Sequence, residues 1–191
     1  MINIKPQANF GDAIAHEQLR ELYFFWQSCC HDGKYPRQKD IQLSIVPHLV
    51  SNCYIMDVLE DQKFINRFVG TNIDRHLGIS LTGKHTDEYR RGTTLKTQTD
   101  FFTYVSQTGM CGHLITRMSS EANEHLIYHR SAMPLSDDGV TINKLLGGWY
   151  HHPIDSNSPP LYRVDTTEYE QTALMSVTYE DSLPDKIRAV S

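Results

Sequence analysis

The spacing of apolar residues changes along the chain, and the change separates predicted helices from predicted strands. Between residues 14 and 30 the apolar positions recur every three or four residues: Ala15, Leu19, Leu22, Trp26 and Cys29. This spacing predicts an amphipathic helix. Residues 53–59 and 63–69 are instead rich in β-branched and aromatic types and flank the polar turn 60–62, which predicts a β-hairpin.

Short elements are predicted on either side of the hairpin. Residues 40–50 read as a short helix with Asp40 as its cap, although Pro47 interrupts it. After the hairpin, Gly70 ends the strand and Thr71 is the expected cap of a helix of little more than one turn. Gly78 is expected to end that helix in the left-handed conformation, which glycine adopts without strain.

The second half of the chain moves from helical spacing to strand spacing. A long helix is predicted from about Asp87 or Thr93 through Gln107, with Gly109 after its end. Three strands follow, at residues 112–119, 125–133 and 140–149. Residues 173–179 read as one more strand or helix.

This order of elements predicts an α+β fold: a five-stranded antiparallel sheet covered by helices on one face, with an N-terminal helical extension. Three regions are expected. Residues 1–34 form an N-terminal extension that carries the amphipathic helix, residues 35–150 form one domain, and residues 151–191 form an acidic C-terminal tail.

Composition and charge narrow the class of protein. A chain of 191 residues can bury one core, and its formal net charge of −5 argues against nucleic acid as a partner. We expect no membrane span, because no apolar run approaches about 20 residues. The four cysteines lack CxxC spacing and no apolar leader precedes them, so we expect reduced thiols in a cytoplasmic protein.

Several short motifs, in their order along the chain, are similar to those of a known family. They are Leu19, Leu22 and Trp26; Pro36-Arg37, Asp40-Ile41 and Asp57-Val58; Arg67-Phe68-Val69-Gly70-Thr71 with Leu81-Thr82-Gly83; and Pro134-Leu135, Asp138-Gly139 and Leu145-Leu146-Gly147. From about residue 19 to residue 149 the chain resembles the PAS fold. More narrowly, it resembles a family of small bacterial PAS-domain proteins with a long N-terminal helix.

The resemblance implies a sensory or regulatory domain that stands alone, with no room for an output domain beside it. We therefore expect a cytoplasmic, non-catalytic module that binds a small-molecule ligand or a protein partner. A homodimer formed through the exposed side of the N-terminal helix is the expected assembly. Two alternatives stay open: a small enzyme that uses the same cavity, and a scaffold protein whose pocket is filled.

Five residues are predicted to contact a ligand: Arg67, Phe68, Ile73, Leu77 and Phe101. The apolar four either fill or line the cavity expected in such a fold. Arg67 is a charge in an otherwise apolar strand, so it anchors an anionic ligand or pairs with a neighbouring carboxylate. We favour the pair, with Asp57 directly across the hairpin.

The histidines suggest a metal site only weakly. His125 and His129 share one face of a strand but lie about 13 Å apart, too far to hold one ion, and His113 could lie opposite His129. We interpret these residues as a polar sheet surface. His151 and His152, with Asp155, give a still weaker signal, and no metal site is predicted.

Cofactor and catalytic motifs are not found. His76 and His85 are the histidines that could reach a haem in such a pocket, yet neither lies in a haem motif, so no cofactor is assigned. GxSxG, HExxH and the full phosphate-binding motif GxxxxGK[ST] are missing from the sequence. The expectation is therefore a protein that is not an enzyme.

Overall fold

The computed structural model describes residues 10–14, 16–31, 34–118, 126–153, 162–163 and 169–177. The helices are α1 (Phe10–Ala13), α2 (Glu17–Ser28), α3 (Thr71–Leu77), α4 (Thr86–Tyr89) and α5 (Gly92–Thr108). Short 3₁₀ helices are η1 (Gln38–Asp40), η2 (Leu43–Ile45), η3 (Val50–Asn52) and η4 (Glu60–Gln62). The strands are β1 (Cys53–Val58), β2 (Phe64–Val69), β3 (Cys111–Met118), β4 (Leu126–Ser136), β5 (Ile142–Pro153), β6 (Tyr162–Arg163) and β7 (Tyr169–Val177).

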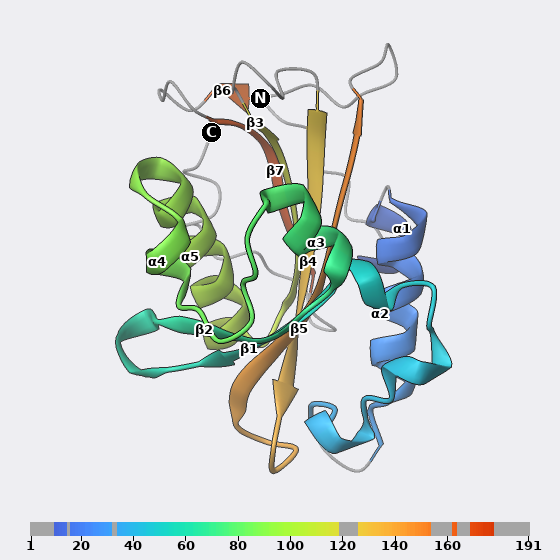
Figure 1. Ribbon diagram of the computed structural model, residues 1–191. Coiled ribbons are helices and arrows are strands. Elements are labelled where there is room, and N and C mark those ends of the chain that lie inside the picture. The colour runs from blue at the N-terminus through green and yellow to red at the C-terminus, as the bar shows by residue number, and fades with distance from the viewer. Residues whose placement is uncertain are drawn as a thin grey trace.

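All the strands join one antiparallel sheet in the order β2-β1-β5-β4-β3-β7-β6 (Figure 1). The predicted α+β class is confirmed, and β1–β5 are the five predicted strands. The sheet is wider than predicted, because β7 pairs with the edge of β3 and β6 pairs with β7. Residues 151–191 were predicted to form a tail, but part of this segment belongs to the sheet. Its backbone forms hydrogen bonds with the edge of β3, which would otherwise be open.

Helices cover both faces of the sheet, not one face as predicted (Figure 1). On one face α2 packs against a core that includes Met133, Leu135 and Leu146. On the other face α3 and α5 pack against a second core that includes Leu145 and Tyr128. The neighbours Leu145 and Leu146 point to opposite faces, as successive strand residues must, and both are fully buried.

The helix α2 lies within the range in which apolar spacing predicts a helix. Its buried face includes Leu19, Leu22 and Trp26. The indole Nε1 of Trp26 donates a buried hydrogen bond of 2.8 Å to the carbonyl of Pro134 on β4. A residue with no backbone N–H thus has its carbonyl satisfied by a side chain from the helix, which fixes α2 on this face.

Some local predictions were wrong. Residues 40–50 form separate 3₁₀ turns instead of an α-helix, with Pro47 between η2 and η3. The N-cap of α3 is Gly70, and no side chain caps the helix there. A Cβ at Gly70 would lie 2.3 Å from the Ser51 carbonyl oxygen, so the backbone approach excludes the residue types that usually cap. The left-handed helix end at Gly78 is confirmed, and Gly109 follows the end of α5 as predicted.

Candidate functional site

A cavity lies between the sheet and the helices α3, α4 and α5. It consists of two hollows that share Arg90, Gln98, Arg130 and Trp149. The first has a cavity volume of about 20 Å³ and the second of about 30 Å³, and both are partly open to solvent. The first is also lined by Tyr54, Met56, Asn66, Val69, Ile73, Leu77, Leu81, Tyr89 and Phe102, and the second by Thr94, Thr97, Leu114, Thr116 and Tyr128.

Arg130 lies on β4, opposite Trp149 on β5. Its guanidinium carbon is 5.5 Å from the centre of the Trp149 ring and 5.9 Å from that of Phe102 on α5, which makes two cation–π contacts. With its amide oxygen turned toward the strand, Gln98 accepts from both terminal nitrogens of Arg130. The guanidinium is therefore held in one orientation at the junction of the two hollows.

Arg90 reaches the same junction from the end of α4. The helix stops there because Arg90 takes an extended conformation, with φ −119° and ψ 151°. Its guanidinium carbon lies 5.5 Å from the centre of the Tyr89 ring. The Nε of Arg90 is buried and has no hydrogen-bond partner among the described residues. A buried donor without a partner costs free energy, so this site calls for an acceptor.

Hydrogen bonds fix the polar groups at the β1–β2 side of the cavity. The Tyr54 hydroxyl donates to the Ser131 carbonyl at 2.5 Å. The Asn66 amide donates to the Tyr89 hydroxyl at 3.1 Å and to the Lys84 carbonyl at 3.0 Å. Burial raises the pKa of Tyr54, and the charge of Arg130 partly opposes that rise.

An aromatic cluster borders the cavity where α3 meets the sheet. The His76 Nε2 lies 2.9 Å from the Tyr128 hydroxyl, and its ring contacts those of Trp149 and His151, with centroids 5.3 Å and 4.2 Å away. Burial lowers the pKa of His76, and the charges of His151 and Arg90 lower it further. The positive charge of Arg90 thus acts on a group at the edge of the cavity.

The structure separates the five predicted ligand-binding residues. Ile73 and Leu77 line the cavity. Phe101 is fully buried in the core beside it, on the same face, and is not among the lining residues. Phe68 packs against the core on the α2 face, so the sheet separates it from the cavity. Arg67 is half exposed and lies outside the cavity.

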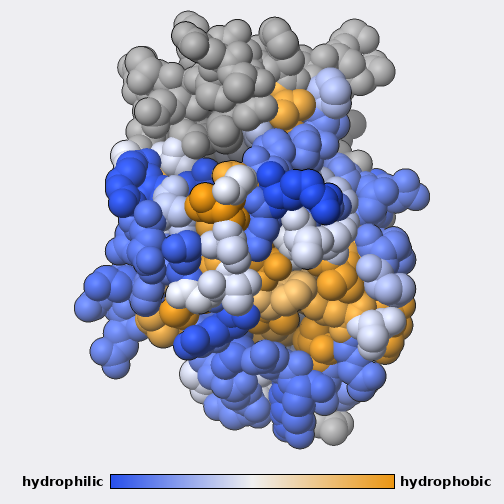
Figure 2. Space-filling view, in the orientation of Figure 1, coloured by the Kyte–Doolittle hydropathy of each residue, from blue (hydrophilic) through white to orange (hydrophobic). Residues whose placement is uncertain are grey.

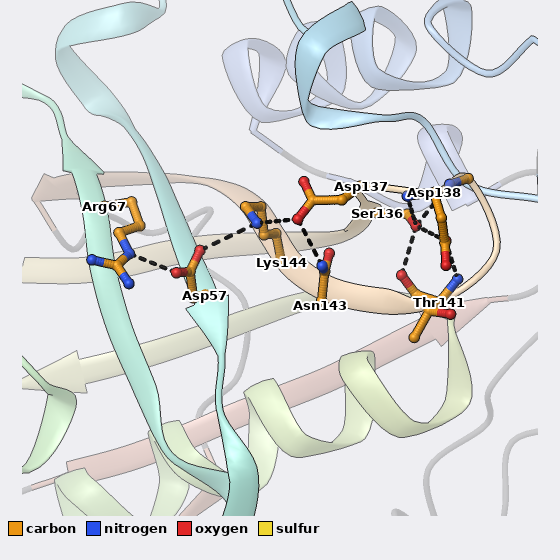
Figure 3. A network of polar contacts seen from close by, with 9 residues as sticks. Asp57, Arg67, Ser136, Asp137, Asp138, Thr141, Asn143 and Lys144 are labelled. Atoms are coloured by element: carbon orange, nitrogen blue, oxygen red, sulfur yellow. Dashed lines mark hydrogen bonds and ion pairs between the residues drawn. The ribbon is translucent and has the colours of Figure 1, made fainter.

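Arg67 belongs to a surface network of charges (Figure 3). Its Nε donates to Asp57 at 2.6 Å, and Lys144 lies 3.7 Å from Asp57 and 2.7 Å from Asp137. The pairing with Asp57 was predicted, but the register was wrong, because Asp57 lies opposite Ile65. The register shifts so that Arg67 is an extra residue in β2, and it reaches Asp57 along a diagonal.

Sequence reasoning missed the residues that carry charge into the cavity. Neither Arg90 nor Arg130 was singled out from the sequence. The sequence did contain a signal for Arg130. Tyr128, Arg130 and Ala132 are spaced two residues apart on one strand, so the charge of Arg130 lies on the same face as two buried side chains. Gln98 gave none, since a glutamine on a helix is usually exposed.

Histidine rings form a chain on the α2 face of the sheet. The Nδ1 of His129 lies 3.3 Å from His113 Nε2, and the Nε2 of His129 lies 2.9 Å from His152 Nε2. The Nδ1 of His152 donates to the Pro153 carbonyl, so in neutral rings His129 donates to His152 and His113 donates to His129. The buried Nδ1 of His113 is then an acceptor with no partner among the described residues.

The interpretation of these histidines as a polar sheet surface was wrong. His113 and His129 are buried, because the chain around α2 covers this face, and His16 lies with its ring 5.4 Å from that of His129. Burial, with neighbouring histidines, lowers the pKa of His16 and His113 to about 4 and that of His129 to about 3. His125 and Asp155 lie outside the described residues, and His152 joins the chain.

Few of the described residues are candidates for metal binding or for reactions of a thiol. Within the described ranges, no three His, Cys, Asp or Glu side chains are grouped so that they could hold a metal ion. All four cysteines are thiols, and three of them are buried. Burial raises the pKa of Cys53 to about 12, which leaves it protonated and unreactive at neutral pH.

These features define the chain as an α+β protein with an open antiparallel sheet and a cavity that contains two arginines. Comparisons of the chain with protein-family models, curated proteins and solved structures found no match. In the part of the chain that the structure describes, no helix combines the length and the apolar character needed to cross a membrane.

Proposed function

We propose that this protein is a non-catalytic sensory or regulatory module of the PAS type, and that it binds a small molecule in the cavity between the sheet and α3–α5. The observation that carries the proposal is the convergence of Arg90, Gln98 and Arg130 on one junction, within a lining that is otherwise mostly apolar. A few placed polar groups in an apolar hollow are typical of small-molecule sites.

The chemistry of the lining supports binding over catalysis. The described residues that line the two hollows include no Asp, Glu, His or Cys. General acid–base catalysis works best with a group whose pKa lies near the working pH. Arginine keeps its proton at all working pH values, and burial raises the pKa of Tyr54 further from neutrality. The lining can therefore hold and orient a molecule, and it offers no proton shuttle.

The arrangement of the elements supports the PAS type. Two strands come first, the helices α3, α4 and α5 follow, and three strands complete the core of the sheet. Two glycines in the motifs that resemble the PAS family have a positive φ, which is typical of turns: Gly83 at 84° and Gly139 at 86°. Asp138 of the same motif accepts hydrogen bonds from the backbone of Val140 and Thr141, which closes the β4–β5 turn (Figure 3).

The second face of the sheet supplies a route for a signal. α2 packs on β4 and β5, the strands that carry Arg130 and Trp149 into the cavity. Apolar residues also gather on the surface over α2 and the 3₁₀ segments (Figure 2), where the side chains of Phe24 and Ile45 are 41% and 66% exposed. Such a patch is suited to a protein partner or to a second copy of the chain, as in the proposed homodimer.

A cavity-filling variant tests the proposal. Ile73→Phe places a larger ring in the cavity, whereas Ile79→Phe makes the same change at a side chain that is 44% exposed just beyond α3. Native mass spectrometry and thermal-shift screening with small metabolites are expected to find a ligand for the wild type and for Ile79→Phe, and none for Ile73→Phe. The same spectra report whether the protein is a dimer.

The proposal fails if no compound stabilises the wild type, or if Ile73→Phe binds as well as the wild type does. Circular dichroism of each variant confirms that it is folded, so that loss of binding is separated from loss of structure.

A further inference from the structure

Four histidines lie together where α2 begins, and we call them the histidine cluster: His16, His113, His129 and His152. We propose that this cluster is an acid-sensitive switch. When it gains protons, α1 and the N-terminal end of α2 leave the sheet, and the rest of the fold stays formed. Its biological role rests on the proposed function, in which α2 carries a signal from the sheet to a partner.

The N-terminal end of α2 lies over the histidine cluster. His16 is the N-cap of the helix, and its side chain makes no capping hydrogen bond. Its ring packs instead against those of Tyr150 and His129, with centroids 4.4 Å and 5.4 Å away. The other end of α2 is fixed separately, by the hydrogen bond from Trp26 to the Pro134 carbonyl. The position of the N-terminal end therefore depends on the packing around the histidines.

The hydrogen bonds of the cluster leave no nitrogen that can gain a proton without a cost. In the neutral chain of rings, His129 Nε2 donates to His152, and His129 Nδ1 accepts from His113. A proton on either accepting nitrogen would set two N–H groups against each other, and the bond would be lost. The Nδ1 atoms of His113 and His16 are buried and have no partner among the described residues, so a proton there would bury a charge without an acceptor. Protonation at any of these nitrogens therefore weakens the packing beneath α2.

The sheet side of the cluster supplies no opposing charge among the described side chains. β3 contributes His113, β4 contributes His129, and β5 contributes His152 and Tyr150. Burial raises the pKa of Tyr150, so its hydroxyl stays neutral in acid. The pKa of His113 and of His129 is lowered by burial and by neighbouring histidines, and no described carboxylate is among the causes. A positive charge gained by these rings is therefore not offset from the sheet.

The helix side of the cluster adds repulsion. The N-terminus of a helix carries the positive end of its dipole, so an imidazolium at His16 is unfavourable there. Arg20 adds its charge to the same turn, where its Nε and Nη2 donate to the Ile14 carbonyl at 3.1 Å and 3.0 Å. Glu17 is the acidic residue of the first turn, but it is exposed and is not among the causes that shift the pKa of His16. Protonation of the cluster therefore repels this end of the helix.

Release of the N-terminal end of α2 returns the histidines to water, where an ordinary histidine has a pKa of about 6.5. Below that pH the released form binds more protons than the docked form, so each pH unit favours release by up to about tenfold for each buried histidine. The apolar core on the other face, which includes the fully buried Phe101 and Leu145, has no such dependence. This end of α2 is therefore expected to move before the fold as a whole is lost.

A pH titration of the full chain, followed by NMR, tests the movement. From pH 7.5 to pH 5, the backbone amide resonances of α1 and of residues 17–22 are expected to move to positions typical of an unfolded segment. The amide resonances of α5 and the indole resonance of Trp26 are expected to keep their native positions. The chain has two tryptophans, so a Trp26→Phe variant assigns that indole signal.

Three variants assign the movement to the histidine cluster. His129→Gln can still accept from His113 and donate to His152, but it has no group that titrates, so the midpoint of the movement is expected to fall by about 0.5 pH units or more. His31→Gln makes the same change at an exposed histidine, and its midpoint is expected to match that of the wild type. His16→Asn introduces a residue type that is favoured at an N-cap, so it is expected to fold even if His129→Gln does not, and to lower the midpoint in the same direction.

The outcomes separate this switch from the proposed function. If all native resonances disappear at one pH, the effect of acid is global unfolding and the proposed movement is wrong. The switch is also overturned if residues 17–22 keep their native resonances down to pH 5, or if His129→Gln and His16→Asn both titrate as the wild type does. Ligand binding at neutral pH enters none of these results, so the proposed function stands or fails by the metabolite screen alone.

Discussion

Two neighbouring residues on β4, His129 and Arg130, carry nitrogen bases to opposite faces of the sheet, and burial affects them differently. On the α2 face, burial lowers the pKa of His129 to about 3, so the imidazole is neutral and bonds to other neutral imidazoles. On the α5 face, Arg130 keeps its charge, and Arg90 adds a second one.

The difference shows how each face can satisfy its buried nitrogen groups. A histidine that loses its proton can pass hydrogen bonds along a chain of rings, so the α2 face is closed and needs no counter-ion. A guanidinium has no such option, so the α5 face keeps a cavity and an open donor at Arg90. The first arrangement is therefore expected to be sensitive to acid.

The largest expected effect is a loss of stability in mild acid, which tests the α2 face. The pKa values of His16, His113 and His129 lie below the ordinary 6.5, so the unfolded chain binds more protons than the folded protein between about pH 6.5 and 4. Stability is therefore fully present above pH 6.5 and falls as the pH decreases through this window.

The size of the loss follows from about 1.4 kcal/mol per pH unit for each buried group. His113 and His129 together are expected to cost about 3 kcal/mol between pH 7.5 and 5.5, and His16 costs less because it is half exposed and solvent screens its charge. Urea denaturation at a series of pH values above 5 measures this, where carboxylates contribute little.

A matched pair of variants assigns the acid effect. His113→Phe removes one buried group and is expected to reduce the loss between pH 7.5 and 5.5 by roughly half, on the order of 1 kcal/mol. Arg67→Gln changes a surface residue and leaves every histidine in place, so its loss between pH 7.5 and 5.5 is expected to match that of the wild type. An equal pH dependence in all three proteins would remove the histidine chain from the explanation.

A smaller effect is expected from adding a methyl group to each face of β5. A Cβ at Gly147 would lie 2.2 Å from the Ser131 carbonyl oxygen and 2.2 Å from the Tyr54 ring, and neither can move freely. Gly147→Ala is therefore expected to cost about 2–3 kcal/mol. A Cβ at Gly148 would instead lie 2.5 Å from a terminal methyl of Leu19, which can rotate away, so Gly148→Ala is expected to cost at most about 1 kcal/mol.

Thermal or urea unfolding of the two alanine variants measures the difference. Equal losses would show that the α2 face is packed as rigidly as the cavity face. The prediction that the α2 face accommodates an added methyl group better than the cavity face does would then be wrong.

The smallest effect is expected at the surface pair that sequence reasoning singled out. Arg67→Gln removes an ion pair whose arginine is 51% exposed, so it is expected to cost about 0.2–1 kcal/mol. Asp57 keeps Lys144 within 3.7 Å, which limits the loss further. A loss above about 2 kcal/mol in urea denaturation would mean that this network supports the hairpin more strongly than an exposed pair can.

The sequence was most informative where a local rule decides the structure. The strands β1–β5, the helix α2 and the helix ends at Gly78 and Gly109 follow from spacing or from the special conformations of glycine. The cap of α3 was mispredicted because the choice of Gly70 depends on the Ser51 carbonyl, nineteen positions earlier. Local sequence carries no record of such a contact.

The candidate site was less predictable for the same reason. Ile73 and Leu77 were named because an apolar stripe is visible in the sequence, and both line the cavity. Arg90, Gln98 and Arg130 were missed, because each is an ordinary polar residue until three separate elements bring them together. The histidines were noticed, yet their burial could not be foreseen without the helix that covers them.

By itself, the sequence determined the kinds of elements, their order and the alternation that gives each strand two faces. The tertiary structure alone decided that α2 covers one face, that β6 and β7 extend the sheet, and that two arginines meet in a cavity. The physical reason is the range of the forces involved. Spacing and glycine conformation act within a few residues, whereas burial, pKa shifts and charge convergence depend on side chains that are distant along the chain and meet only after folding.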